Sequence, residues 1–216
     1  SQNKKYNSKG LTGSEVAVKL LNQNGITDVE VKECGFWRML GTGNSYSPRK
    51  KTIYLRGNII NNPSITSIAL AAQKVALAKQ DRDGDKVFKT RSKLAIFGLT
   101  CAVTFVPIVL IGLLFDFIIS NTVGIATIIA SVIAVCFFII SIVAQHMTLK
   151  SEIKANKDAV VMLAEAGMVN EAEVVSVQKI YRTYITEIII NYVLSILELI
   201  RLILKILLEI AKAKGK

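Results

Sequence analysis

The sequence is poor in the side chains that most catalytic and metal sites need. It has one histidine, His146, and three cysteines, Cys34, Cys101 and Cys136, with no pair at metal-binding spacing. A histidine in a zinc site or a nucleophile triad needs partner residues, and this chain lacks them. Two of the cysteines lie in apolar runs, where a thiol behaves as a small hydrophobic group. The sequence therefore predicts structural thiols and no metal or other cofactor.

Acidic residues are also scarce, since 16 Asp and Glu stand against 27 Lys and Arg, for a net charge of +11. A basic excess can serve nucleic acid, anionic lipid or an acidic partner, so its distribution decides. The basic residues form no continuous block, and many of them flank apolar segments. We therefore expect contact with a lipid bilayer and no nucleic-acid partner.

The apolar content points to a membrane protein. It reaches 51%, with a mean hydropathy of +0.44, above that of an ordinary soluble domain. Residues 94–115 and 123–144 carry no charge, and each run is close to the ~20 residues that cross a bilayer. Residues 1–9 are polar, so we expect insertion through these internal segments. The short connection between them predicts an antiparallel transmembrane hairpin.

The flanks of this hairpin predict its orientation. Basic residues precede and follow it, whereas the connecting turn has none. By the positive-inside rule, both flanks face the cytoplasm or an organelle matrix. We therefore expect an integral protein of a bacterial plasma membrane or mitochondrial inner membrane, with its N-terminal module and C-terminus on that side. The flanking residues are Lys86, Lys89, Arg91, Lys93, Lys150 and Lys154.

The part before the hairpin predicts a small α+β module. A helix is expected from about residue 12 to 24, and another from 64 to 80, with Ser64 as its cap. Residues 27–33 and 51–55 alternate like strands and are expected to form an antiparallel pair. The aromatic residues of the intervening loop, Phe36 and Trp37, are expected to pack onto the core. The alternative is a binding surface, with basic residues of the same loop on lipid phosphate.

The part after the hairpin predicts a helix over 154–166 and a long apolar helix over about 173–212. The longest uncharged run of the last helix, 188–197, is too short to span a bilayer. We therefore expect this helix to lie in the membrane interface or against a partner. Its polar residues form one stripe that would contact lipid or protein: Glu187, Asn191, Glu198, Arg201, Lys205 and Glu209.

Five segments together resemble the membrane-associated putative neutral zinc metallopeptidases of the YugP type. They are GLTGSEVAVKLLNQNGITDVEV, YSPRKKTIYL, SITSIALAAQKVALAKQ, EIKANKDAVVMLAEAGMV and TYITEIIINYVLSILELIRLI. The resemblance implies a zincin-like helix and strand module over residues 1–90 and a transmembrane hairpin over 91–149. It also implies a helical region over 150–216 that completes the module.

In that family, the helix corresponding to 64–80 carries a His-Glu-x-x-His motif, which binds zinc and activates water. Here the resemblance places Gln73 and Leu77 at the ligand positions and Lys74 at the general-base position, with Glu152 at the later acidic ligand. Such a set is a degenerate zinc site, so we expect no metal and no enzymatic activity. We also expect Lys74 and Glu152 to form an ion pair in place of the metal.

Two functions follow from these expectations. The first is a structural or scaffold subunit that binds other membrane-protein subunits in a larger complex, because the apolar surface exceeds what one small fold can bury. The alternative is a regulator that holds a peptide or a membrane-protein segment in the former substrate cleft without cleaving it. An exposed groove beside Gln73 and Lys74 would favour the alternative.

Overall fold

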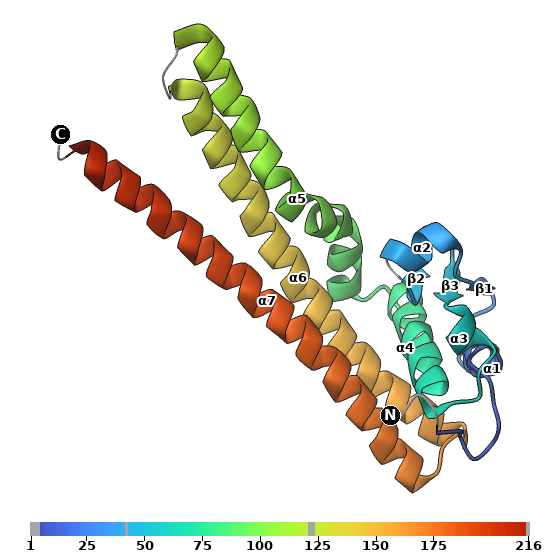
Figure 1. Ribbon diagram of the computed structural model, residues 1–216. Helices are drawn as coiled ribbons and strands as arrows, with labels where there is room; N and C mark the ends of the chain where they lie inside the picture. The colour runs from blue at the N-terminus through green and yellow to red at the C-terminus, as the bar shows by residue number, and fades with distance from the viewer. Residues whose placement is uncertain (1–4, 42, 121–123, 215–216) are drawn as a thin grey trace. The chain divides into compact units, whose positions relative to one another are not determined.

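The computed structural model describes residues 5–41, 43–120 and 124–214 (Figure 1), with side chains except those of residues 41, 96–106, 120, 202 and 205–214. The chain divides into two compact units. The first comprises residues 1–89 and 149–187, and the second comprises residues 90–148 and 188–216. The fold is helix-rich with one small sheet, in agreement with the expected α+β class.

The first unit contains a sheet of three short strands. These are β1 (Glu30–Glu33), β2 (Ser45–Ser47) and β3 (Thr52–Leu55), in the order β1-β3-β2. The central strand β3 pairs antiparallel with β2 but parallel with β1. The predicted antiparallel pair of 27–33 and 51–55 is therefore wrong. The long connection between β1 and β3 holds a helix and β2, and this is enough chain for the crossover that parallel pairing needs.

That connection also corrects the expectation for its aromatic residues. Residues Phe36–Gly41 form a short helix, α2, and Trp37 on it is 84% exposed. Phe36 is exposed as well, so neither ring packs onto the core. The core consists instead of side chains from other elements, most of them aliphatic.

Three helices of the first unit pack against one another, and two of them, α1 and α4, also contact the sheet. Helix α1 (Gly13–Gln23) begins with a capping box formed by Thr12 and Glu15. The short helix α3 (Gly57–Ile60) passes close to Gly13, where a Cβ would collide with the Ile59 carbonyl. Helix α4 (Ile65–Arg82) is capped by the Ser64 hydroxyl, which accepts the Ser67 N–H. Close approach of these elements therefore depends on small residues and on well-formed caps.

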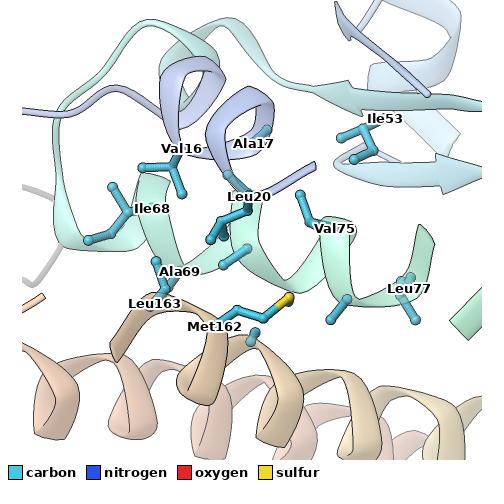
Figure 2. Close-up of a cluster of buried hydrophobic side chains, with 14 of the residues drawn as sticks. Val16, Ala17, Leu20, Ile53, Ile68, Ala69, Val75, Leu77, Met162 and Leu163 are labelled. Carbon is cyan, nitrogen blue, oxygen red and sulfur yellow. The ribbon is translucent and has the colours of Figure 1, made fainter. Parts of the chain in front are cut away.

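Helix α4 is the centre of the core. Figure 2 shows α4 between α1 on one side and α6 on the other, with aliphatic side chains filling both contacts. Its run of alanines, including Ala69 and Ala72, lets both neighbours approach closely. The labelled side chains are Val16, Ala17, Leu20, Ile53, Ile68, Ala69, Val75, Leu77, Met162 and Leu163.

Three long helices make up the rest of the chain. They are α5 (Lys86–Ser120), α6 (Ile125–Glu165) and α7 (Glu171–Lys214). In the second unit, the Asp116 carboxylate of α5 accepts the N–H groups of Gly124 and Thr127, each at 2.8 Å. Gly112 of α5 also lies close to Ala130 of α6. These contacts form the antiparallel hairpin that the sequence predicts, although residue 123 of its second segment lies outside the described residues.

Two helices in the described part of the chain are long and apolar enough to cross a membrane: Ile125–Glu165 and the Glu171–Arg201 part of α7. This finding rests on length and composition and is consistent with membrane association. The second helix differs from the expectation that the terminal helix is unsuited to span. This part of α7 is long and apolar enough to span a membrane even though it includes charged residues. A search for uncharged runs alone does not find it.

We expect the Leu20→Ala substitution to destabilise the first unit by about 2–5 kcal/mol, because it leaves a cavity where α1 meets α4. Pulse proteolysis in mild detergent measures the free energy of unfolding. The matched control is Val18→Ala on the exposed side of the same helix, which should change it by less than about 0.5 kcal/mol. Equal effects of the two substitutions would contradict the assignment of this core.

The contacts of Asp85 predict that the free energy of unfolding of the same unit falls in acid. Its carboxylate accepts the Lys154 ammonium at 2.6 Å and the Phe88 N–H at 2.9 Å, and the hydrogen bond from Lys154 holds its pKa below the ordinary 3.8. A lowered folded pKa stabilises the fold above the unfolded value, and this contribution is lost as pH falls through the folded pKa. We expect Asp85→Asn to reduce the slope of unfolding free energy against pH below 3.8. An unchanged slope would show that this carboxylate titrates alike in both states.

Candidate functional site

Helix α4 carries the three residues that the resemblance places at the zinc-motif positions. Gln73, Lys74 and Leu77 are all buried. Leu77 belongs to the aliphatic cluster of the core and contacts no polar site there (Figure 2). The polar pair of the motif is therefore Gln73 and Lys74, and each one has a different environment.

Gln73 ties α4 to α6 through a buried hydrogen-bond network. Its Nε2 donates to Glu152 Oε2 at 2.9 Å and to Asn156 Oδ1 at 2.7 Å. Glu152 and Asn156 are one helical turn apart, so both face α4. Glu152 therefore lies beside Gln73 in the structure. The sequence argument missed Asn156, although its position four residues after Glu152 was the available signal.

A second amide contact lies two turns further along α4. Gln80 Nε2 donates to the Ser151 carbonyl at 3.1 Å, and the Ser151 hydroxyl donates to Gln80 Oε1 at 2.8 Å. All of these groups are buried, so each hydrogen bond prevents the cost of an unpaired polar group. Gln73 and Gln80 are seven residues apart and lie on the same face of α4. Together they set the register of α4 against α6.

Lys74 lies on a different side of the site. Its Nζ is 5.5 Å from the centroid of the Tyr184 ring on α7, within the range of a cation–π contact. The neighbouring Tyr181 is fully buried and donates its hydroxyl to the Ala69 carbonyl at 2.6 Å, and burial raises the pKa of that hydroxyl. The ion pair of Lys74 with Glu152 stays a prediction.

These groups do not fit a zinc ion. The Gln73 amide uses its N–H bonds on Glu152 and Asn156, Leu77 offers no donor atom, and the Lys74 ammonium adds positive charge. Zinc sites use thiolate, imidazole and carboxylate ligands. In the part of the chain that the structure describes, no cluster of three such residues could hold a metal ion. We therefore derive no catalytic step through zinc.

Residues 44–51 join the sheet to α4. Asn44 Oδ1 accepts the Arg56 N–H at 2.7 Å. The Tyr46 hydroxyl donates to Asp81 Oδ2 at 2.7 Å, and burial, together with this hydrogen bond, raises its pKa. Lys51 binds the same carboxylate at 2.8 Å. These contacts fasten the β2–β3 hairpin to the end of α4.

An open groove of about 730 Å³ adjoins the network between α6 and α7 within the first unit. Asn156 lines it, and in the described residues the Asn156 Nδ2 and Gln73 Oε1 atoms have no hydrogen-bond partner. Its walls combine aliphatic groups with the cations of Lys157 and Arg182. The lining residues are Ile153, Asn156, Lys157, Val160, Gln178, Tyr181, Arg182, Ile185 and Thr186.

The polar stripe of the last helix is present in part on α7. Glu187, Asn191, Glu198 and Arg201 are all exposed. Arg201 Nη1 lies 3.3 Å from Glu198 Oε1, an ion pair one turn long. The side chains of Lys205 and Glu209 lie outside those described. The four described residues of the stripe are free of contacts that bury them.

A family model described as putative neutral zinc metallopeptidase matches residues 1–207. No curated protein and no solved structure matches the chain. The family match confirms the resemblance proposed from the five segments, whereas the zincin-like likeness of the module stays a prediction. It contradicts the prediction that the chain is not an enzyme, because the family description is that of a peptidase.

We expect Glu152→Ala to lower the free energy of unfolding of the first unit by about 1–3 kcal/mol, because it removes the acceptor of a buried Gln73 N–H. The matched control is Glu165→Ala, at an exposed position of the same helix, which should change it by less than about 0.5 kcal/mol. Pulse proteolysis in mild detergent makes the comparison. If the two variants unfold alike, the network does not tie α4 to α6.

Proposed function

The chain belongs to the putative neutral zinc metallopeptidase family, and from that premise we propose that it acts as a structural or scaffold subunit of a larger membrane complex. The observation that carries this proposal is the surface of α7. Its 171–201 part is apolar enough to cross a membrane, yet none of its most apolar window is buried. Apolar area of this extent is covered by lipid or by another protein.

The polar stripe favours protein over lipid for one side of α7. Glu198 and Arg201 lie among exposed apolar residues such as Leu197 and Ile200. A charged group facing hydrocarbon costs about 2.5–3.5 kcal/mol on insertion scales, so such groups usually face protein or water. A neighbouring subunit with complementary polar groups would satisfy this stripe while lipid covers the remaining faces.

We further propose that the chain is an integral membrane protein whose hairpin of α5 and α6 crosses the bilayer. The flanks of this hairpin are rich in Lys and Arg, and the tip between 116 and 124 has neither. This supports an orientation with the first unit on the cytoplasmic or matrix side of a bacterial plasma membrane or mitochondrial inner membrane. The lipid bilayer and other membrane-protein subunits are then its partners.

The groove between α6 and α7 favours a second candidate function, the binding of a peptide or a membrane-protein segment. It lies beside Asn156, which contacts Gln73 of the former zinc motif. Ile153, Val160 and Ile185 supply apolar wall, and Lys157 and Arg182 supply positive charge. Such a mixture suits a segment with apolar and acidic side chains.

Native mass spectrometry of the protein, extracted from its own membrane in mild detergent, tests the scaffold proposal and weighs bound metal at the same time. We expect a defined assembly with other subunits, and no zinc in this subunit. The double variant Glu198→Ala with Arg201→Ala should lose partners, whereas Lys179→Ala, an exposed position earlier on the same helix, should retain them.

A lone protomer from the wild-type membrane would contradict the scaffold proposal. One zinc ion in each protomer would contradict the donor chemistry at Gln73, Lys74 and Leu77. A lone protomer that co-purifies with a peptide, which is lost on Arg182→Glu, would favour the second candidate.

A further inference from the structure

Helix α2 presents an apolar patch that the functions above do not use. Phe36 is 63% exposed, Trp37 84% and Leu40 65%. The rings of Phe36 and Trp37 meet edge to face, with centroids 5.7 Å apart. We call these three residues the α2 patch. Two large aromatic side chains side by side in water are typical of an interaction surface.

Hydrogen bonds and stacking hold the patch on the sheet. The Arg38 guanidinium stacks 3.8 Å above the Tyr54 ring of β3, and its Nη1 donates to the Ser45 hydroxyl at 3.2 Å. Arg56 Nη2 donates to the Met39 carbonyl at 3.3 Å. These contacts anchor the polar side of α2 to the strands and leave its apolar side outward. The patch is thus presented by the fold.

The same contacts place two permanent positive charges at the base of the patch. Guanidinium groups stay protonated at every physiological pH and bind phosphate oxygens in a planar, bidentate manner. Carboxylates are present as well, since Glu33 approaches Gly57, the residue after Arg56. Arg38 belongs to α2, and Arg56 donates a hydrogen bond to it, so both of these groups bring positive charge to the helix.

This combination matches the headgroup region of an anionic bilayer. Tryptophan concentrates at membrane interfaces, where its ring lies among headgroups, and neighbouring Arg residues add attraction to anionic lipid. The unit that carries α2 continues directly into α5, and the chain includes helices able to cross a membrane. Membrane-crossing helices would tether this unit to the bilayer, so the unit would meet lipid at a high effective concentration.

We propose that the α2 patch docks on an anionic lipid surface, with the Phe36, Trp37 and Leu40 side chains among the headgroups and Arg38 and Arg56 near lipid phosphate. This proposal rests on the proposal that the chain is an integral membrane protein. It does not depend on the scaffold role. It gives the first unit a membrane contact of its own. Loss of partners in mass spectrometry would leave this proposal standing, and failure of lipid docking would leave the scaffold proposal standing.

Trp37 is the only tryptophan of the chain, so its fluorescence reports on the patch alone. The full chain is reconstituted in nanodiscs of phosphatidylcholine and in nanodiscs that also contain phosphatidylglycerol. With phosphatidylglycerol we expect a blue-shifted emission maximum, less quenching by acrylamide from water, and new quenching by brominated acyl chains. Raising the salt concentration should partly restore acrylamide quenching, because screening weakens the attraction to anionic lipid.

The variant Phe36→Ser with Leu40→Ser keeps the reporter and removes its apolar neighbours, and it should lose the protection of Trp37. The matched control is Val175→Ser, an exposed apolar position on α7 in the same unit, which should behave as wild type. Because the comparison of lipids uses the wild-type chain, a folding defect in a variant does not decide the result.

Three results would overturn the proposal. Strong acrylamide quenching in both kinds of nanodisc, without quenching by brominated acyl chains, would show that Trp37 stays in water. Protection in phosphatidylcholine alone would remove the role of anionic lipid. Protection that rises with the number of chains in each disc, without quenching by brominated lipid, would identify a second copy of this chain as the occupant.

Discussion

The fold depends on the contact between two helices that are far apart in the sequence. Helix α4 lies in the core with almost no exposed side, so its polar side chains must find partners inside the protein. Gln73 meets Glu152 and Asn156, and Gln80 meets Ser151, across 71 to 83 residues of chain. These pairs fix how α6 lies against α4. The packing of α1 and β3 on the remaining faces of α4 completes the unit around this contact.

The family and the site give different views of this contact. The family description is that of a putative zinc metallopeptidase, and in a catalytic zinc site the metal joins the histidine and carboxylate side chains that bind it. Here an amide joins Gln73 to Glu152, so hydrogen bonds make a link of the same kind. Hydrogen bonds to a charged group contribute about 1.5–3 kcal/mol each, which is enough to hold two helices in register. Protein groups alone therefore join α4 to α6 at this point.

Sequence reasoning succeeded where neighbouring residues decide the outcome and failed where distant segments decide it. The Ser64 cap of α4 and the hairpin of α5 and α6 follow from local patterns, and both are present. The direction of pairing between β1 and β3 depends on how the connection crosses the sheet, and alternation in the two strands is the same for either direction. The exposure of Phe36 and Trp37 was missed because their size suggested burial, whereas aliphatic residues from other elements had filled the core.

The sequence by itself determined the longer helices, the Ser64 cap, the long apolar segments, the basic flanks and the membership of the family. These properties depend on side chains within a few turns of each other, or on the order of segments along the chain. Only the tertiary structure decided that Asn156 joins the Gln73 network, that Lys74 lies over Tyr184, and that α2 presents its rings outward. Each of these depends on which side chains occupy the limited space of the core, and that is decided only when all the segments pack together.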